Sequence, residues 1–405
     1  MTLEQLQSLD TNKSFHEFIQ QNINADVNAL RLKKFPELSF DPKFAILQIE
    51  CKNRIKRKLP TIFNHDNFFF PNLISTEQCT AEKIAEFHAS LLNHDDNVLD
   101  MTGGLCIDTF YISQRVANVT AIELDQTIAT VSAHNMAAFA PNVTVINADS
   151  TQYIKDTQSR FDIVFIDPAR RGTNNKRLFG MTDCAPDVVA LLPEIKRIAH
   201  TLYIKASPMI DISQSISDLG NLVSDVWVLS INNECKELLF KVILNADKQP
   251  SYSIHTINFE NSNTQHFSVD SGIHQSPVTI YNTDTCTHLY EPNSSIMKAQ
   301  LFDSLSHKYN LPQLQKNSHL YIGENLITHF PGRCFSIIKI IPFNNKETKK
   351  ISSEYPQINV SVRNFKLSAD ELKKKLRVKD GGQYYLFGTT LHTNSAVLII
   401  CQKVK

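Results

Sequence analysis

The chain has 405 residues, of which 42% are apolar and 20% are charged, a composition typical of a folded protein with more than one domain. Lysine plus arginine and aspartate plus glutamate both number 41, so the formal net charge is zero. No global field therefore attracts the chain to nucleic acid or to a membrane, and any polyanion-binding site must be local.

The eight cysteines lie far apart and show neither a C-x-x-C motif nor a paired Cys/His ligand spacing. This spacing predicts reduced thiols and no metal site. The first residues lack the basic start and apolar stretch of a signal peptide, and no window approaches the roughly eighteen consecutive apolar residues of a membrane span. We therefore expect a cytoplasmic chain that is neither exported nor membrane-spanning.

Residues 1–74 show apolar positions at three- and four-residue spacing, as in FHEFIQ and KFAILQIECKNRIKRKLP, and predict a helical N-terminal domain. The next segment, STEQCTAEKIAEFHASLLNHDD, predicts a helix that opens on a capping box between Ser75 and Gln78. His88 falls on the apolar face of that helix and is interpreted as a packed residue rather than a ligand.

Strands and helix-length segments alternate after this helix, which predicts a doubly wound, parallel α/β sheet. Two further apolar segments, 225–231 and 237–244, lie too close together for a helix between them and predict an antiparallel hairpin at one edge of the sheet. Residues 75–246 thus predict a seven-stranded Rossmann-like domain. Its five parallel strands are expected at residues 97–101, 119–124, 143–148, 161–167 and 201–206.

The C-terminal part predicts two smaller α+β modules. Residues 247–330 have few long apolar runs but contain short alternating stretches such as SYSIHTINFE. Residues 331–405 predict strands in CFSIIKIIPF, INVSVRNF, YYLFGTTL and SAVLIICQK. The helix of this last module is expected to open on a capping box between Ser368 and Glu371 and to close near Gly381-Gly382.

The first predicted parallel strand ends at Asp100 and leads through Thr102, Gly103 and Gly104 into a helix. A strand, a turn of small residues and a helix N-terminus place free backbone N–H groups where they can bind an anion or a carboxylate. A G-x-G-x-x-G fingerprint is absent from this turn, which argues against a nicotinamide-dependent dehydrogenase.

Three further strand tips carry acidic residues. Glu123 ends the second strand, where a carboxylate can accept both hydrogen bonds of a ribose diol, and Asp149 follows the third strand, where it can meet an adenine edge. Asp167 and Pro168 end the fourth strand, in the stretch FDIVFIDPARRG. Taken alone, each of these carboxylates is equally well explained as a solvated charge at the end of a strand. Because ligands of open α/β sheets bind outside the carboxyl ends of the strands, the four tips together predict a site for an adenosine-containing cofactor.

These motifs resemble those of class I S-adenosylmethionine-dependent methyltransferases. The segments STEQCTAE, DMTGG, IDPARR, KASPMID, NNECKELLF, YEPNSSIMKA, FPGR and SVRNF are similar, more closely, to the bacterial members with a C-terminal THUMP-like domain. The resemblance implies a ferredoxin-like region at 247–330, a THUMP-like domain at 331–405 and S-adenosylmethionine as cofactor. It implies that Asp100 and the turn 102–104 face the amino-acid end of the cofactor, Glu123 its ribose, Asp149 its adenine and Asp167 the acceptor.

Two further features bear on this site. Cys106 stands where the family often has the third small residue of the turn, usually glycine, so its side chain either crowds the methionine tail or packs beneath it. Lys205 and Asp211 are expected to pair across the crevice.

The acceptor-side tip favours nitrogen as the methylated atom. Asp167 and the carbonyls of Pro168 and Ala169 can accept the hydrogens of an amino group, although Arg170 stands where related enzymes carry a base-stacking aromatic residue. A D-P-P-R tip occurs in pyrimidine-C5 methylases, which need a cysteine nucleophile at the next strand tip. Ala206 occupies that place, which disfavours C5 chemistry.

Arg170 and Arg171 have two interpretations. In the first, they bind a phosphate or stack on a base near the transferred methyl group. In the second, they form ion pairs with carboxylates such as Asp183 and Asp187.

Two basic stretches, 51–60 and 366–380, can supply phosphate contacts, although such runs are usually solvated helix faces. The second lies in the THUMP-like module, a relative of RNA-binding domains, and is favoured by that analogy. We expect a metal-free methyltransferase acting on a nitrogen of a base in RNA (rRNA or tRNA). The rival hypotheses are a methyltransferase of protein or small molecules and a catalytically inactive, S-adenosylmethionine-binding RNA scaffold.

Overall fold

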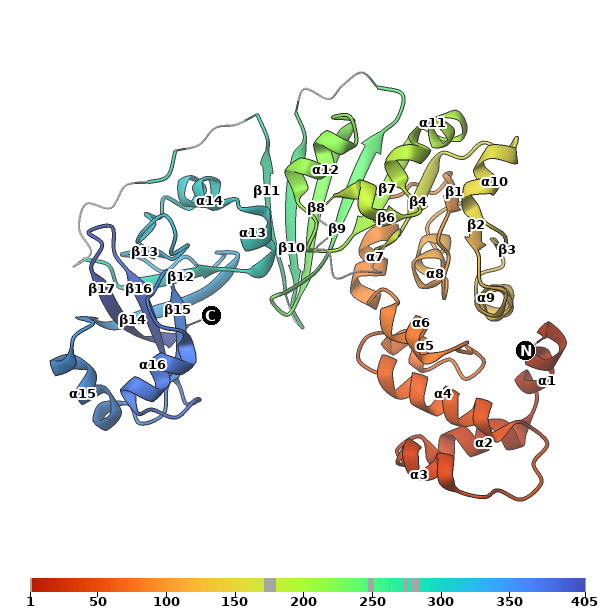
Figure 1. Cartoon of the computed structure of the whole chain (residues 1–405), viewed down its shortest axis with the longest axis horizontal. Helices are drawn as coiled ribbons and strands as arrows, with labels where there is room; N and C mark the ends of the chain where they lie inside the picture. Colours follow the sequence, from red (N-terminus) through yellow and green to blue (C-terminus); the bar gives the residue numbers. More distant parts are fainter. Residues whose placement is uncertain are drawn as a thin grey trace. The chain divides into compact units, whose positions relative to one another are not determined.

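The structure, a computed structural model, describes residues 2–170, 180–246, 251–261, 263–272, 276–278 and 285–404 (Figure 1). The chain divides into two units, one formed by Met1–Ser224 and Leu239–Gln249 and the other by Asp225–Leu238 and Pro250–Lys405. Within the described ranges, no helix is long and apolar enough to cross a membrane.

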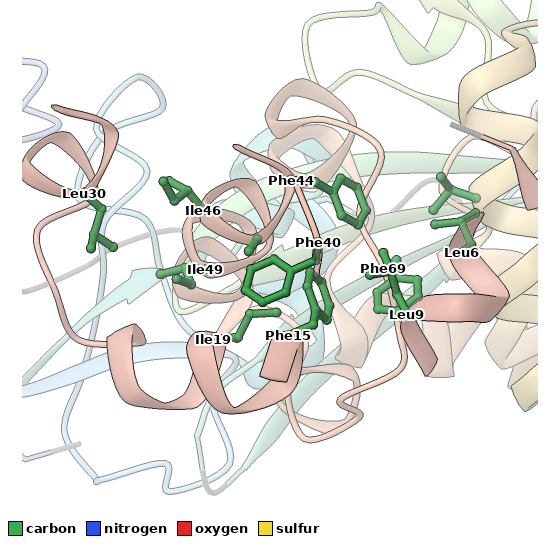
Figure 2. Packing of buried hydrophobic residues seen from close by; sticks show 12 residues of the cluster. Leu6, Leu9, Phe15, Ile19, Leu30, Phe40, Phe44, Ile46, Ile49 and Phe69 are labelled. Carbon is green, nitrogen blue, oxygen red and sulfur yellow. The ribbon is translucent and has the colours of Figure 1, made fainter. Parts of the chain in front are cut away.

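Among the described residues, only helices precede the first strand of the first unit, which confirms the helical character predicted for residues 1–74. Phe15 is fully buried there and packs edge-on against Phe40 and Phe69, with ring centroids 5.4 and 6.0 Å away (Figure 2). The helices are α1 (Leu3–Asp10), α2 (Lys13–Asn22), α3 (Val27–Leu32), α4 (Pro42–Ile55), α5 (Pro60–Phe63), α6 (Leu73–Gln78) and α7 (Glu82–Ser90). The boundary of this region as a domain stays a prediction.

The helix start predicted at Ser75 is wrong. Asn72 caps α6, and its side chain accepts a hydrogen bond from the backbone N–H of Ser75, which lies inside the helix. Helix α6 then ends at Gln78, and α7 begins at Glu82 without a side-chain cap. The capping-box spacing was coincidental because a competing cap residue stands three positions earlier. The break between the two helices leaves Thr80 free to turn toward the sheet.

Helix α9 (Gln126–Phe139) fixes the N-terminal helices to the sheet domain of the same unit. The side chain of Asn135 is fully buried, accepts a hydrogen bond from the N–H of Phe69 and donates one to its carbonyl, both at 2.9 Å. Nε2 of His134 lies 2.9 Å from a carboxylate oxygen of Asp10. A buried amide satisfied on both sides fixes the register of the contact, since a slip would leave polar groups unpaired.

The main sheet has the strand order β11-β10-β8-β9-β7-β4-β1-β2-β3. The five predicted parallel strands are confirmed as β1 (Asn97–Asp100), β2 (Asn118–Glu123), β3 (Val143–Asn147), β4 (Ile163–Ile166) and β7 (Thr201–Ala206). The chain winds outward from β1 to β3 and then returns to β4 on the other side of β1. The carboxyl ends of β1 and β4 therefore flank the switch point at which open α/β sheets bind their ligands.

Strands β8 (Val223–Ile231) and β9 (Glu234–Ile243) form the predicted hairpin through Asn232 and Asn233, which both have positive φ, as a two-residue turn requires. The expected place at a sheet edge is wrong. Strand β10 (Ser253–Phe259) pairs in parallel with β8, and β11 (Thr264–Asp270) pairs with β10. The sheet has nine strands rather than seven, and the largely buried β8 is an interior strand, as its apolar run also allows.

The second unit contains a sheet of order β13-β12-β14-β17-β16-β15. Its strands are β12 (His288–Pro292), β13 (Tyr321–Gly323), β14 (Gly332–Pro342), β15 (Asn359–Arg363), β16 (Tyr384–Thr390) and β17 (Ala396–Lys403). Its helices are α13 (Ser294–Ala299), α14 (Phe302–Tyr309), α15 (Asn345–Glu354) and α16 (Ala369–Leu376). The capping box of Ser368 and Glu371 is confirmed. The helix closes earlier than expected, because Arg377 rather than a glycine adopts the left-handed backbone at its C-cap.

Candidate active site

Asp100 lies beneath the turn that follows β1. It is 2% exposed, and its carboxylate accepts hydrogen bonds from the N–H of Thr102 at 3.0 Å and from the hydroxyl of Thr109 at 2.6 Å. Burial raises the pKa of Asp100 to about 6, although both hydrogen bonds act to lower it. The structure therefore places Asp100 as a support of the turn, below the surface that a ligand can reach.

Gly103 and Gly104 form the surface of this turn. A Cβ on Gly103 would lie 3.3 Å from Ala121 and from the carbonyl of Ile122, so the turn packs directly on β2. Gly104 has a φ of +52°, and a Cβ there would meet nothing closer than the carbonyl of Thr102 at 3.8 Å. The missing side chain of Gly104 therefore leaves open space beside the turn, here called the cradle, where a ligand can approach the backbone closely.

Cys106 packs beneath the turn, which decides between the two expected positions of its side chain. Its φ of 57° is in the left-handed region that glycine favours. The residue is fully buried, and its Sγ lies 3.4 Å from the position of a Cβ on Gly103. Burial raises the pKa of the Cys106 thiol far above its ordinary value. The thiol thus fills space under the glycines and does not enter the cradle.

Glu123, at the tip of β2, binds the turn of β1. One carboxylate oxygen accepts the N–H of Gly104 at 2.8 Å, and the other accepts the N–H of Asp125 at 2.7 Å. The amide of Asn147 donates to the carbonyls of Glu123 and Leu124, which ties the tip of β3 to that of β2. Leu124 is 72% exposed. Sequence reasoning missed this leucine, which offers an apolar contact to a flat ring beside the Glu123 carboxylate.

Asp149, at the tip of β3, is exposed and caps helix α10 (Ser150–Asp156). One of its carboxylate oxygens accepts hydrogen bonds from the backbone N–H of Thr151 at 2.8 Å and from its hydroxyl at 2.7 Å. These bonds to Thr151 lower the pKa of Asp149. The carboxylate is therefore held in place at the tip by the helix that it caps.

Asp167, at the tip of β4, is joined to the turn of β1. Its N–H donates to the hydroxyl of Thr102 at 2.7 Å, which brings the predicted cofactor turn and the predicted acceptor tip side by side. The side chain of Asp167 is 49% exposed, whereas Pro168 is buried. The backbone of Arg170 lies in the short strand β5 (Ala169–Arg170). The side chain of Arg170 and the whole of Arg171 lie outside the described residues, so neither interpretation of the two arginines is tested.

A buried lysine connects Asp167 to the interior. Nζ of Lys205, at the end of β7, donates to Asp167 at 2.8 Å, to Asp108 at 2.9 Å and to the hydroxyl of Thr80 at 2.7 Å. Asp108, in the first turn of α8 (Ile107–Ser113), is also bound by Nδ1 of His88 at 2.8 Å. Burial alone would raise the pKa of Asp108, but Lys205 and His88 outweigh it and hold this pKa well below its usual range.

The expected pairing of Lys205 with Asp211 is wrong. Asp211 instead caps helix α12 (Ile212–Asp218) and accepts the N–H of Gln214 at 2.8 Å. Sequence reasoning also missed Thr80 and Asp108. A signal was present, since a lysine inside the apolar run TLYIKA implies a buried anion. The local pattern does not name that partner, which stands 97 residues away.

Ala206 ends β7 and is 7% exposed, so among the described residues this strand tip presents no thiol to an acceptor ring. In the part of the chain that the structure describes, no cluster of three or more His, Cys, Asp or Glu side chains is arranged to hold a metal ion.

In each of the two basic stretches, one lysine forms an ion pair within the protein. Lys52 is buried and forms an ion pair with Asp66 at 3.0 Å, and Lys373 forms ion pairs with Asp370 and Asp380 at 3.6 and 3.3 Å. The surface charge available for phosphate is therefore smaller than the sequence suggests.

Three family models match the chain: ribosomal RNA adenine dimethylase over residues 64–162, a ferredoxin-like domain over 288–331 and a THUMP domain-like model over 332–403. A crystal structure from Porphyromonas gingivalis W83, assigned as a methyltransferase, superposes with a TM-score of 0.85. It is 27% identical, and the match covers 97% of this chain and 98% of that one. The chain thus combines a methyltransferase-like domain with ferredoxin-like and THUMP-like domains. The predicted α/β methyltransferase fold with ferredoxin-like and THUMP-like modules is thereby confirmed.

A curated relative of this chain is an uncharacterized RNA methyltransferase of Mycoplasma mobile, 32% identical over 91 residues. The matched segment is 22% of this chain, and the chain spans about a quarter of the length of that relative, 24%. The residues at the strand tips fit S-adenosylmethionine. The backbone at Gly104 is open to a ligand, its N–H is bound by the Glu123 carboxylate, and the exposed Leu124 follows Glu123 in the chain.

Proposed function

We propose that this chain is a cytoplasmic S-adenosylmethionine-dependent methyltransferase that acts on a nitrogen of a base in RNA (rRNA or tRNA). The observation that carries the proposal is the hydrogen bond between the N–H of Asp167 and the hydroxyl of Thr102 at 2.7 Å. It joins a glycine turn suited to the cofactor to a carboxylate tip suited to an acceptor.

The residues proposed to hold the cofactor come from the tips of three neighbouring strands. The turn from Thr102 to Gly104 would face its amino-acid end, with Asp100 supporting that turn from below. Glu123 would accept from the ribose hydroxyls, Leu124 would contact the adenine ring, and Asp149 would meet its edge. When bound, S-adenosylmethionine supplies a methyl group on a positively charged sulfur.

The acceptor side is proposed to orient an amino group by hydrogen bonds. Lys205 donates a hydrogen bond to Oδ2 of Asp167, and among the described residues no group donates to Oδ1. Oδ1 and the carbonyls of Pro168 and Ala169 are thus suited to accept the N–H hydrogens of an exocyclic amine and to direct its lone pair. Ala206 at the next tip supports nitrogen over pyrimidine C5, since C5 methylation needs a thiolate.

RNA as the substrate class is supported by the descriptions of one family model and one relative. The model that matches residues 64–162 describes ribosomal RNA adenine dimethylases, and the Mycoplasma mobile relative is described as an RNA methyltransferase. The THUMP domain-like match at 332–403 adds a module of the kind expected to contact RNA.

Transfer of a tritiated methyl group from S-adenosylmethionine tests this function. The acceptors to compare are RNA from cells that lack the gene, protein from the same cells and their small-molecule fraction. We expect label in the RNA alone, and we expect Asp167→Asn to abolish it, because an amide N–H₂ would face the donor hydrogens of the base. Label in protein or in small molecules would overturn the RNA assignment, and no label in any fraction would favour a non-catalytic scaffold.

A further inference from the structure

The second unit contains a cavity of about 490 Å³, a size within the roughly 300–1,000 Å³ range of small-molecule sites. It lies between the C-terminal end of α13, the first turn of α14 and the loop 313–319. All of its lining residues belong to this unit, and none of them is among the strand tips described above. The function proposed for the methyltransferase sheet therefore leaves the cavity unexplained.

A stacked pair of rings forms one wall of the cavity. The ring centroids of Phe302 and His319 lie 3.7 Å apart with an interplanar angle of 17°, and both residues are partly exposed. A pair of parallel rings presents a flat face, which suits a planar ligand better than a sugar or a flexible chain.

Amide side chains and one cation occupy the rest of the lining. Gln300 and Asn317 each carry a donor and an acceptor, the amide of Gln313 already donates to Asp303 at 3.1 Å, and Lys316 is an exposed residue of the lining. Paired donors and acceptors beside a flat ring match the edge of a nucleobase. An inorganic anion alone would not need them, and the carboxylate of Asp303 in the same lining would oppose it.

His319 has an unsatisfied polar atom. Its Nδ1 is buried and has no hydrogen-bond partner, which is costly in a folded protein unless a ligand supplies one. Burial, and then the charge of Arg363, lower the pKa of His319, so the imidazole is neutral at neutral pH. A neutral ring nitrogen can donate to or accept from a base, depending on its tautomer.

The backbone around the cavity is strained. His319 has a φ of 52° and Gln300 a φ of 57°, the left-handed region that residues other than glycine seldom adopt. Such strain persists only where the surrounding structure fixes it, and it is common at ligand sites. Here it holds the His319 ring against Phe302 and places Gln300 in the lining.

Positive charge from a neighbouring strand adjoins His319. Arg363, at the end of β15, is bound to the buried Glu291 at 2.8 Å, and its side chain remains 39% exposed. Asn364 donates to Gln315 at 2.9 Å, which fixes the loop that carries Lys316 beside this strand. A phosphate attached to a base in the cavity would thus meet Lys316, whereas the charge of Arg363 is engaged by Glu291.

We propose that this cavity binds one unstacked nucleotide of the RNA substrate, with the base on the Phe302–His319 pair and its phosphate near Lys316. The inference rests on the proposed RNA substrate and adds a second contact site for it. Recognition of a splayed-out base by aromatic stacking and amide hydrogen bonds is the common way in which proteins read single-stranded RNA.

Fluorescence anisotropy with a short fluorescein-labelled single-stranded RNA and the full chain tests the proposal. We expect Lys316→Glu and Asn317→Ala each to weaken RNA binding on the order of tenfold, because they remove a phosphate contact and a base contact. The matched control is Lys349→Glu, an exposed lysine of α15 in the same unit, which should change affinity by less than about twofold. Unchanged melting temperatures of the variants would show that folding is intact.

Photocrosslinking of RNA that contains 4-thiouridine provides a second readout. We expect the crosslinked peptide to span residues 302–319. If the wild-type chain binds RNA but crosslinks elsewhere and both variants bind as the wild type does, the cavity assignment is overturned while the RNA substrate stands. If the wild-type chain binds no RNA, the proposed substrate class fails with it. Tighter binding of free AMP than of RNA would assign the cavity to a free nucleotide and overturn the RNA contact.

Discussion

The ammonium group of Lys205 lies 2.8 Å from Oδ2 of Asp167 and 2.9 Å from Oδ2 of Asp108. The side chain of Lys205 is only 6% exposed, so one buried cation links the acceptor-side tip of β4 to helix α8. Because Lys205 also donates to Thr80, all three of its N–H groups are committed to fixed partners. Lys205 is therefore a positioning residue, which holds Asp167 in one orientation.

Lys205→Met should lower both stability and methyl transfer. Removing Lys205 takes from the buried Asp108 its cationic lysine partner and leaves it only His88 and Thr80, which should lower the free energy of unfolding by about 3–5 kcal/mol. A misplaced Asp167 should reduce kcat on the order of a hundredfold while S-adenosylmethionine affinity stays nearly constant. Chemical denaturation, calorimetry and single-turnover kinetics measure the three quantities. Lys196→Met, at an exposed lysine of α11 (Val188–Ile198), is the matched control.

A double variant separates the structural role of Lys205 from its positioning role. Combining Lys205→Met with Asp108→Asn should recover part of the lost stability, because a neutral amide costs less to bury than a carboxylate that has lost its lysine partner. Methyl transfer should stay low in the double variant. Recovery of activity along with stability would mean that Lys205 acts through folding alone.

The stability of the wild-type chain relative to Asp100→Asn should fall as the pH rises. The pKa of Asp100 is raised from 3.8 to about 6 in the fold. The contribution of Asp100 to the free energy of unfolding is therefore fully present below pH 3.8 and is lost as the pH rises through about 6. The full change corresponds to about 3 kcal/mol. The lowered pKa of Asp108 makes stability change with pH in the opposite direction. Because Asp108 is present in both proteins, this effect cancels in the stability difference between them. Urea denaturation of both proteins between about pH 4 and 7 measures the effect, and a pH-independent difference would refute it.

Glu123→Gln should weaken S-adenosylmethionine binding by about tenfold or more. Glutamine has one acceptor oxygen in place of two, so it cannot bind Gly104, Asp125 and a ribose diol together. Isothermal titration calorimetry measures the loss. Glu17→Gln, at an exposed position of α2, makes the same chemical change far from the sheet and should leave affinity unchanged. Equal affinity of the Glu123 variant and the wild type would remove Glu123 from the cofactor site.

Cys106→Ala should leave cofactor affinity within about twofold of the wild type, because the thiol packs beneath the glycine turn and not in the cradle. The buried thiol, with its raised pKa, should react with Ellman's reagent only after unfolding. Rapid labelling of Cys106 in the native protein, or a large gain in affinity in the alanine variant, would place the side chain on the ligand side.

The strand tips were predictable because each follows a buried apolar run that stops at a polar or small residue. Asp100, Glu123 and Asp167 all lie at the ends of their strands as expected, since parallel strands present their carboxyl ends at one edge of a sheet. The hairpin of β8 and β9 was predictable for a local reason, the lack of space for a helix.

The partners of these residues were not predictable from local pattern. Thr80 and Lys205 are 125 residues apart, and only the packing of α7 and α8 against the sheet brings them together. The extension of the sheet by β10 was missed for a related reason, because a short alternating stretch does not reveal which strand it pairs with. Leu124 was missed because exposure, rather than residue type, distinguishes it from a core leucine.

Nucleoside mass spectrometry of RNA from cells that lack the gene tests the central claim most directly. The account predicts that one N-methylated nucleoside is missing from rRNA or tRNA, that the wild-type gene restores it and that the Asp167→Asn gene does not. An unchanged set of methylated nucleosides, or full restoration by the Asp167→Asn gene, would contradict it.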